Sequence, residues 1–463
     1  MRRAASPSAG CARKKTALAA SFRSEFAAEI EALTEGAVDA WDLEAIETAA
    51  LRKAKQFTAR IVERRFNSDT TDHAGPSRPC PCGKTARYAG RRLKTFESAL
   101  GPLTLSRAYF HCEACETGVV PRDGKLGLAG GSLTPAVRRM VGHVGAQDSF
   151  QEGHELLRDL AGVQVSPKHV ERAAEALGRE IAADEKAVVE GPAANEPLPE
   201  TLYLGLDGSG IPMRAAELEG RAGKQPDGKS KTREVKLVTI WSAEKCDEEG
   251  IPVRDEGSQT YSAAIESAAQ KDTDPALSPF AQRVQREATR RGFERAKRRA
   301  VVADCAPWIW NTIAGLFPDA IQIADRYHVN EHLSDAAKAI YGPESDLGKK
   351  WAHDRCTELK AGKLDAVLAA LATHSVVPKV SECIGYIENN RHRMRYAEFH
   401  AAGLCTSSGV VESGCKRVIG VRLKRGGMFW TVAGADAIIA LRACRLSGRF
   451  EEFWERRALK ATG

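Results

Sequence analysis

The sequence predicts an α/β protein whose second half forms a mixed sheet with an all-helical insertion. Three observations support this fold class. Beyond residue 200, apolar runs with strand periodicity alternate with helical segments, residues 346–396 have helical periodicity only, and a cysteine-rich segment precedes both. A chain of 463 residues is long enough for several domains, each with a core of its own.

The composition is that of an ordinary globular protein, with 43% hydrophobic and 28% charged residues. No apolar run is long enough for a transmembrane helix. The first residues are basic and lack the continuous apolar segment of a secretory signal, so we interpret residues 1–70 as a basic arm followed by helices. Scattered cysteines elsewhere in the chain are typical of reduced thiols and favour a cytoplasmic location.

Positive charge gathers in two stretches, although the net charge is only +7. Residues 281–300 contain eight Lys or Arg and two Glu, and residues 416–463 contain eleven Lys or Arg and four Asp or Glu. Two such stretches together indicate a polyanionic partner, whereas a single run is more typical of a solvated helix face.

Residues 71–128 form a cysteine-rich, zinc-ribbon-like region. Its thiols come in two pairs separated by short strands: Cys80-Pro-Cys82 and Cys112-Glu-Ala-Cys115. Two thiolate pairs brought together by a hairpin can complete a tetrahedral, structural Zn²⁺ site. Because the first pair is one residue shorter than the usual spacing, His73 and His111 stay open as substitute ligands.

Residues 129–190 are predicted to be helical and to resemble a helix-turn-helix. One helix is expected to end near Leu160, and another begins after the N-cap residue Ser166. If the second helix is a recognition helix, Lys168, His169 and Arg172 would face a DNA groove. Two packed helices of a bundle are an equally good interpretation of this pattern.

A Pro-rich linker at residues 190–200 is predicted to precede the α/β domain, residues 200–463. Strands are predicted at residues 201–207, 234–242, 251–254, 299–304 and 320–324, and helices at 279–298, 306–316 and 327–341. A helical insertion is expected at about residues 342–400, and a further helix begins near Ser408.

Acidic residues follow two of the predicted strands. The run Leu202–Leu206 ends at Asp207, the run at 301–303 ends at Asp304, and Glu412 lies near the start of a later helix. If the two strands are neighbours, their carboxylates repel each other, and a pair of Mg²⁺ ions would remove that conflict. For each acid taken alone, a turn or capping role is the simpler explanation.

The segment "ADRYHVNEHL" permits a second interpretation. His328, Glu331 and His332 match the H-x-x-E-H pattern of inverted zinc metalloproteases. That alternative leaves Asp207, Asp304 and the basic stretches unexplained, and it lacks a clear third zinc ligand.

Seven motifs occur in order along the chain: "LDGSGIPMR", "GKSKTREVKL", "VVADCAPWIWN", "IQIADRYHVNEHL", "RMRYAEF", "GVVESGCKRVIGVRLK" and "GGMFWTVAGADAIIALR". Together they closely resemble ISKra-type bacterial insertion-sequence transposases. These belong to the DDE group, which has an RNase H-like catalytic core and is akin to Mutator-type transposases. The resemblance extends over nearly the whole chain, the cysteine-rich region included.

The resemblance implies a role for each acid. Asp207 matches the first catalytic residue, Asp304 the second and Glu412 the third, which follows the helical insertion. Asp325 and His328 match a conserved Asp-x-x-His pattern, and the resemblance implies that they support the active site or the DNA rather than bind metal.

The implied reaction is DNA cleavage and strand transfer with two Mg²⁺ or Mn²⁺ ions held by the three catalytic acids. The implied partner is double-stranded DNA, both the terminal inverted repeats and the target, bound by a homo-oligomer of at least two chains. The expected location is the bacterial nucleoid, without membrane contact. A non-catalytic DNA-binding protein derived from a transposase stays an alternative.

Basic residues near the acids are candidate phosphate contacts: Lys231, Arg233, Lys416, Arg417, Arg422, Lys424 and Arg425. Trp308, Trp310 and Trp430 could stack on unpaired bases. For Trp308 and Trp310 we expect core packing instead, because they lie two residues apart in an apolar segment.

Overall fold

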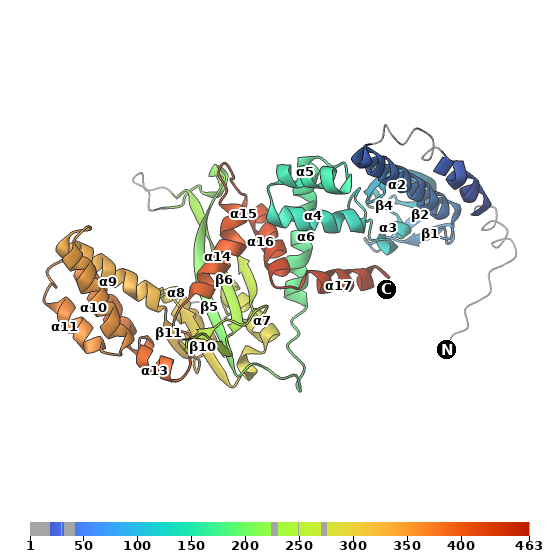
Figure 1. The fold of residues 1–463 in the computed structure, drawn as a ribbon. Coiled ribbons are helices and arrows are strands. Elements are labelled where there is room, and N and C mark those ends of the chain that lie inside the picture. The colour runs from blue at the N-terminus through green and yellow to red at the C-terminus, as the bar shows by residue number, and fades with distance from the viewer. Residues whose placement is uncertain are drawn as a thin grey trace. The chain divides into compact units, whose positions relative to one another are not determined.

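A computed structural model of the chain (Figure 1) describes residues 19–28, 30–31, 42–223, 230–248, 250–269 and 276–462. The first 18 residues, which include most of the predicted basic arm, lie outside this set. The chain divides into a smaller unit (residues 1–144, 150–170 and 456–463) and a larger unit (145–149 and 171–455). Within the described ranges, no helix has the length and apolar character needed to cross a bilayer.

The smaller unit contains an antiparallel sheet packed against a long helix. The helix is α2 (Leu43–Ser68), and the strands, in sheet order, are β1 (Ser77–Pro79), β2 (Thr85–Ser98), β3 (Gly101–Cys112) and β4 (Thr117–Val119). Asp42 caps α2 by accepting a hydrogen bond from the Glu44 amide at 3.1 Å. Alternate residues of β3, among them Leu103 and Leu105, are buried against the helix.

Four helices follow this sheet along the chain: α3 (Pro121–Lys125), α4 (Pro135–Gln147), α5 (Phe150–Ala161) and α6 (Pro167–Ala187). The predicted helix boundary is confirmed. Gly162 adopts a left-handed φ of 67°, and the Ser166 hydroxyl accepts a hydrogen bond from the His169 amide at 3.2 Å. Residues 190–200 contain neither helix nor strand.

The larger unit contains a five-stranded mixed sheet in the order β11-β10-β5-β6-β9. Its strands are β5 (Thr201–Pro212), β6 (Thr232–Ser242), β9 (Thr260–Ala264), β10 (Arg298–Ala303) and β11 (Ile321–Ala324). Strands β5, β6 and β9 are antiparallel neighbours, while β10 and β11 run parallel to β5. A small hairpin, β7 (Lys245–Cys246) and β8 (Pro252–Val253), lies outside this sheet.

Strand β5 differs from the prediction because it does not end at Asp207. It continues through Gly208 and Gly210 to Pro212, paired with β6 along its whole length. A Cβ on Gly208 would lie 2.3 Å from a Glu234 carboxylate oxygen, and one on Gly210 would lie 3.0 Å from the Thr232 hydroxyl. The glycines therefore leave room for cross-strand side chains rather than ending the strand.

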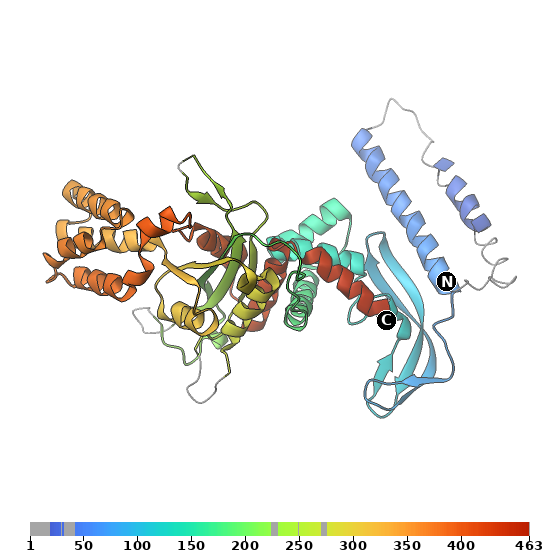
Figure 2. The same ribbon diagram turned by 90° about the horizontal axis from the view of Figure 1, so that it is seen from below.

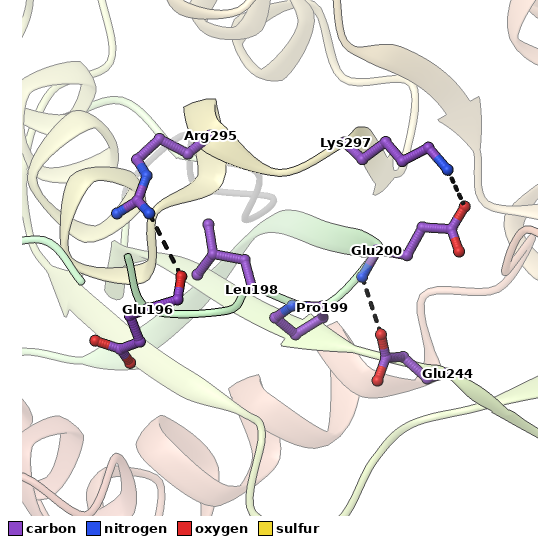
Figure 3. Close-up of a pocket in the computed structure, with 7 residues that line it drawn as sticks. All are labelled: Glu196, Leu198, Pro199, Glu200, Glu244, Arg295 and Lys297. Carbon is purple, nitrogen blue, oxygen red and sulfur yellow. Dashed lines mark hydrogen bonds and ion pairs between the residues drawn. The ribbon is translucent and has the colours of Figure 1, made fainter. Parts of the chain in front are cut away.

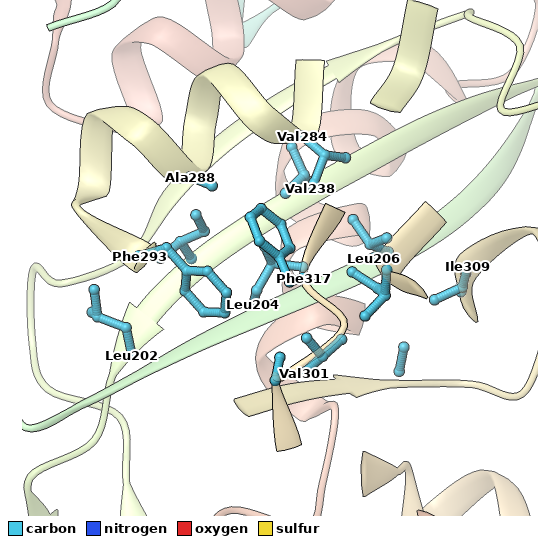
Figure 4. Packing of buried hydrophobic residues seen from close by; sticks show 14 of the residues in the cluster. Leu202, Leu204, Leu206, Val238, Val284, Ala288, Phe293, Val301, Ile309 and Phe317 are labelled. Atoms are coloured by element: carbon cyan, nitrogen blue, oxygen red, sulfur yellow. The ribbon is translucent and has the colours of Figure 1, made fainter. Parts of the chain in front are cut away.

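The two faces of the sheet pack against different helices. Leu202, Leu204 and Leu206 are fully buried with residues of α7 (Pro279–Arg291) and α8 (Pro307–Leu316) in one apolar cluster (Figure 4). Successive residues of a strand point to opposite faces, so Gly205 and Asp207 belong to the other face. That face contacts α14 (Gly409–Cys415) and α16 (Val432–Leu446).

The helical insertion consists of α9 (Arg326–Tyr341), α10 (Asp346–Lys360), α11 (Leu364–Ala372), α12 (Pro378–Asn390) and α13 (Tyr396–Ala401). These helices pack on one another and lie together beyond β11 in both views (Figures 1 and 2). At its base, the Arg326 amide donates to the Thr406 carbonyl at 3.0 Å, so the chain leaves and re-enters the sheet region at one place. After the insertion come a π-helical turn η5 (Lys416–Gly420), α15 (Val421–Leu423) and α17 (Phe450–Thr462).

The basic stretch at residues 281–300 contributes to a buried ion network. Arg283, 5% exposed, pairs with Glu185 at 3.2 Å and with Glu266 at 2.8 Å. Glu287, fully buried, pairs with Arg449 at 2.9 Å and Arg290 at 3.4 Å. A polyanionic partner is therefore the wrong interpretation for Arg283 and Arg290, because carboxylates distant in the sequence already hold their charges.

The predicted linker is tied to the larger unit at an open pocket of about 470 Å³ (Figure 3). The Arg295 guanidinium donates to the Glu196 carbonyl at 3.5 Å, and Lys297 pairs with the Glu200 carboxylate at 3.1 Å. The Glu200 amide donates to Glu244 at 2.9 Å. These contacts fix the entry of the chain into β5.

Candidate functional site

Three aspartates belong to three adjacent strands: Asp207 lies within β5, Asp304 follows β10, and Asp325 follows β11. Strand β10 pairs in parallel with β5, with Val301 opposite Leu204, and with β11, with Ala303 opposite Ala324. If the first register is continued by three residues and the second by one, Asp304 lies opposite Asp207 on one side and opposite Asp325 on the other. Asp304 and Asp325 thus follow the carboxyl ends of two parallel strands, beside Asp207 in the middle of β5.

Glu412 joins this edge from helix α14. Ligand atoms of Asp325, His328 and Glu412 all lie within 4.8 Å of one another, a spacing that permits them to share a metal ion. The His328 imidazole also interacts electrostatically with Asp207 and Asp304. The structure therefore places Asp325, His328 and Glu412 in one group. Asp207 and Asp304 are not part of that group and are related to it by their electrostatic interaction with His328.

The electrostatics of this acidic cluster (Asp207, Asp304, Asp325, His328 and Glu412) favour a cation. Burial raises the pKa of Asp207, and the charge of Asp304 adds to that effect against hydrogen bonds from the Cys415 thiol and the Gly208 amide. Burial lowers the pKa of His328, but the surrounding carboxylates, Asp325 first among them, outweigh burial and leave the pKa raised. The raised pKa of His328 indicates an excess of negative charge around it, whereas the pKa of Asp207 is raised first by burial.

Asp325 is fully buried and holds the segment that precedes α14. One of its oxygens accepts a hydrogen bond from the Tyr327 amide at 3.0 Å, which caps α9, and the other accepts one from the Ser408 hydroxyl. Ser408 lies immediately before α14, the helix that contains Glu412. Asp325 thus connects the end of β11 to the start of the helix that provides the third acid.

Two glycines let α14 approach the sheet. A Cβ on Gly205 would lie 2.2 Å from Val411 Cγ2, and a Cβ on Gly414 would lie 2.9 Å from Tyr261 Cε1. Neither distance is compatible with van der Waals contact, so each close approach requires glycine. Glu412 is positioned by residues on either side of it, Val411 and Gly414.

The donor chemistry of the acidic cluster fits a divalent cation. Carboxylate oxygens are ligands that Mg²⁺ and Mn²⁺ prefer, and an imidazole suits Mn²⁺ better than Mg²⁺. The tightest group of donors contains Asp325 and His328 together with Glu412, whereas the resemblance gave Asp325 and His328 only a supporting part. Glu412 also lies 3.9 Å from Lys416, one helical turn further on.

The H-x-x-E-H alternative finds no support in the geometry. His332 stacks on Tyr386 with ring centroids 3.9 Å apart, whereas His328 lies beside Asp325 and Glu412. The Glu331 carboxylate is 3.1 Å from His328 Nδ1 on the surface of α9. Within the described residues, the two histidines belong to no common group of potential metal ligands.

The four cysteines of the smaller unit converge as two thiol pairs. The Sγ atoms of Cys80 and Cys115 are 3.6 Å apart, and those of Cys82 and Cys112 are 3.7 Å apart. A tetrahedron with Zn–S bonds of about 2.3 Å places its sulfurs about 3.8 Å apart, so the arrangement fits zinc. The two candidate substitutes lie elsewhere: His73 packs on Tyr88 and His111 on Tyr109.

The short Cys80–Cys82 spacing is accommodated by a tight turn. The Gly83 amide donates to the Cys80 carbonyl at 2.9 Å, and the Cys80 amide donates to the Lys84 carbonyl at 2.8 Å. Pro81 occupies the second position of this turn, where its fixed φ is favourable, and Gly83 supplies a φ of 80°. The turn presents both thiols to the second pair.

The candidate DNA contacts differ in exposure. Lys168, Arg172, Lys231, Lys416, Arg417 and Lys424 are exposed, while Arg233 and Arg425 are half-buried. Lys424 donates to the Ser209 hydroxyl at 2.6 Å, which brings this lysine to the strand that contains Asp207. Arg422 is fully buried and donates to the Gly145 carbonyl at 3.2 Å, so the expectation that it contacts phosphate is wrong.

The tryptophans are part of the core. Trp310 is 4% exposed, and Trp308 packs against the same apolar cluster, as expected. Trp430 is also buried, and its indole nitrogen donates to the Leu423 carbonyl at 3.0 Å, so it is not placed to stack on a base.

Two residues of the site were not singled out in the sequence. Cys415 is buried beside Asp207, and the charge of Asp207 together with burial raises the pKa of its thiol. Ser408 was noted only as a helix start, although its hydroxyl binds Asp325. Neither contact has a local sequence signal, because both partners are distant in the chain.

Residues 263–363, which include β10, Asp304, β11, Asp325 and His328, match a family model described as a transposase, DDE_Tnp_ISL3. The match supports an insertion-sequence transposase of the DDE type. It agrees with the resemblance at that level, although the matched model is of the ISL3 type and the resemblance was to the ISKra type. No curated protein gave a significant match. A transposase acts on DNA, and its family suggests an enzyme that cleaves and transfers DNA strands.

Proposed function

We propose that the protein is the transposase of an insertion sequence and that it cleaves and joins DNA strands with the help of divalent metal ions at the acidic cluster. The observation that supports this most strongly is the alignment of Asp207, Asp304 and Asp325 on adjacent strands, with Glu412 brought to the same edge by α14. One segment of the chain that forms this edge is also the segment that matches the transposase family.

The sheet supports an RNase H-like assignment for the larger unit. Three antiparallel strands, β5, β6 and β9, are followed by two strands, β10 and β11, added in parallel on the other side of β5. In this arrangement the first strand is central, and the first two acids lie side by side. The helical insertion falls between the second acid and the third, as the resemblance implies.

The residues of the cluster have distinct roles in this proposal. Asp207, Asp304 and Glu412 hold two Mg²⁺ or Mn²⁺ ions, and Asp325 and His328 support the site beside Glu412. When bound, the metal ions supply activation of an attacking oxygen and stabilisation of a leaving oxygen. The carboxylates fix the scissile phosphodiester in line with the attacking group.

DNA recognition is proposed for the regions before the sheet. The cysteine-rich region, held by Zn²⁺, and the helix pair α5 and α6 would read the terminal inverted repeats, with Lys168 and Arg172 on α6 as contacts. Lys231, Arg233, Lys416, Arg417, Lys424 and Arg425 would bind phosphates in the larger unit. The active form would be a homo-oligomer of at least two chains on nucleoid DNA.

The test uses the full chain with a duplex that contains the terminal sequence of its own element. Asp304→Asn removes one carboxylate charge with little change in volume, and we expect Mn²⁺-dependent cleavage to fall by at least about 10³-fold while DNA binding persists. Asp319→Asn is the matched control, because Asp319 is exposed at the opposite end of β11. Binding without cleavage in the unsubstituted protein, with either metal, would favour a non-catalytic DNA-binding protein instead.

A further inference from the structure

A positively charged site lies in the larger unit, separate from the acidic cluster. A pocket of about 440 Å³ is lined by four arginines, Arg417, Arg425, Arg442 and Arg445, and by one carboxylate, Asp148. We call this set of residues the arginine pocket. A concentration of positive charge around one cavity attracts an anion.

The arginine pocket is built around a buried guanidinium. Arg442 is 6% exposed, and its three nitrogens donate to the carbonyls of Val418, Ala146 and Arg417. These carbonyls fix the direction of the group without neutralising its charge. Arg425, in contrast, pairs with Asp148 at 3.4 Å and is oriented by the Val421 carbonyl.

The electrostatics are strained when the arginine pocket contains no anion. Burial, together with the charges of Arg445 and Arg425, lowers the pKa of Arg442 to about 10, against a smaller opposing effect of Asp148. Burial also lowers the pKa of Arg445. An anion with several acceptor oxygens would relieve this repulsion, and arginine forks match the oxygens of a phosphate group.

The arginine pocket is connected to the acidic cluster by a continuous run of helix. Glu412 lies on α14, Arg417 on η5, Val421 on α15 and Arg425 just beyond it. The nine residue steps from Glu412 to Val421 correspond to about 13 Å of helix. One strand of duplex DNA has a phosphate about every 3.4 Å along its axis, so about four phosphates cover that length.

We propose that the arginine pocket binds a backbone phosphate of the DNA strand that passes the acidic cluster, a few nucleotides from the scissile bond. This assignment rests on the proposed function and makes it more specific. The pocket would hold the strand in register on the helix that provides Glu412. The arginine pocket would recognise the charge of the DNA backbone and not its base sequence, because its guanidinium groups would donate hydrogen bonds to phosphate oxygens only.

The test measures the salt dependence of DNA binding by the full chain with Asp304→Asn, without metal, on a duplex of arbitrary sequence. Each phosphate contact contributes about 0.9 to the slope of log affinity against log salt. We therefore expect Arg425→Gln and Arg445→Gln each to reduce the slope by about 0.9. Between 50 and 200 mM salt, the loss of DNA affinity of each variant should then be about 3.5-fold smaller than the loss measured without the substitution. Arg425→Lys keeps the charge and should retain the slope.

Arg355→Gln is the matched control, since Arg355 is also half-buried and ion-paired, at 2.7 Å from Glu358 on α10. Slopes for the pocket variants equal to that of Arg355→Gln would overturn the proposal. Inorganic phosphate, followed by ³¹P line broadening, separates the two sources of the anion. Phosphate bound by the pocket and displaced by DNA supports the assignment, whereas phosphate retained beside bound DNA overturns it in favour of a free phosphate ligand.

The two proposals fail separately. A reduced salt slope together with no cleavage by the unsubstituted protein refutes the catalytic function and leaves the arginine pocket supported. Cleavage with unchanged slopes refutes the pocket alone.

Discussion

Gly205→Ala is a sharp test of how the third acid is positioned. The added methyl carbon would lie 2.2 Å from Val411 Cγ2, 3.1 Å from Trp241 Cζ3 and 3.3 Å from the Val302 carbonyl oxygen. Carbon atoms in contact are about 3.5–4.0 Å apart, so Val411 must retreat by more than about 1 Å, and α14 with it. Glu412 is the next residue along the helix and would move with it.

The magnitude follows from two opposing effects. Overpacking a core costs about 1–3 kcal/mol, while replacing glycine in a strand recovers about 0.5–1 kcal/mol of conformational entropy. The net loss of about 1–2 kcal/mol corresponds to about 2–3 °C in the melting temperature of a unit of this size. Displacing a catalytic group by about 1 Å can reduce a rate by about 10²-fold, so cleavage should suffer more than stability.

The assay combines thermal unfolding with single-turnover cleavage in Mn²⁺. Adding Val411→Ala removes the clashing methyl group, and the double variant Gly205→Ala/Val411→Ala should recover cleavage relative to Gly205→Ala alone. Gly385→Ala is the control, because a Cβ there meets nothing within 4 Å in the middle of α12. If Gly205→Ala cleaves and melts like the unsubstituted protein, the close approach of α14 does not position Glu412.

Two further predictions concern stability. Cys112→Ser should reduce bound zinc, measured by atomic emission, from about one ion per chain to near zero and should unfold the sheet around the site. As a control, Cys246→Ser, at an exposed cysteine, should retain the metal. Equal zinc content in both variants would contradict the zinc site. Burial opposes ionisation of Glu185, but the charges of Arg283, Arg449 and Arg290 hold its pKa below the ordinary 4.5. Its stabilising contribution is therefore complete above pH 4.5 and lost as the pH falls through the lowered pKa, so urea midpoints should decline less steeply on acidification in Glu185→Gln. The same acid dependence in both proteins would show that Glu185 is not the responsible group.

Local patterns predicted much of the larger unit. The alternation of Leu202, Leu204 and Leu206 identified a strand with one buried face, and the apolar run before Asp304 identified its neighbour. Both signals lie within a few residues of the sequence, where the alternation of apolar residues is enough to identify a strand. The end of β5 was misjudged because glycine usually breaks a strand, whereas here Glu234 and Thr232 on the partner strand occupy the space.

The contacts that complete the site lie outside the reach of such patterns. Glu185 and Arg283 are 98 residues apart in the chain, and Asp325 and Ser408 are 83 apart. A charge run such as residues 281–300 appears solvated until the opposing carboxylates are placed. Likewise, the role of Gly205 depends on Val411, which only the folded chain brings against it.

The base of the helical insertion, where the chain leaves and re-enters the sheet region, has a consequence for how the insertion can vary in length. The excursion from Arg326 to Thr406 is closed by the backbone hydrogen bond between these residues and by the Asp325–Ser408 contact. Tyr396 and Arg393 attach it further to Ala324 and Gln322 of β11. Once the two ends of a loop are held together, the entropic cost of a longer loop grows only with the logarithm of its length. The helices of the insertion can therefore be lengthened, shortened or given a new surface over evolutionary time, while the carboxylates at the sheet keep their spacing.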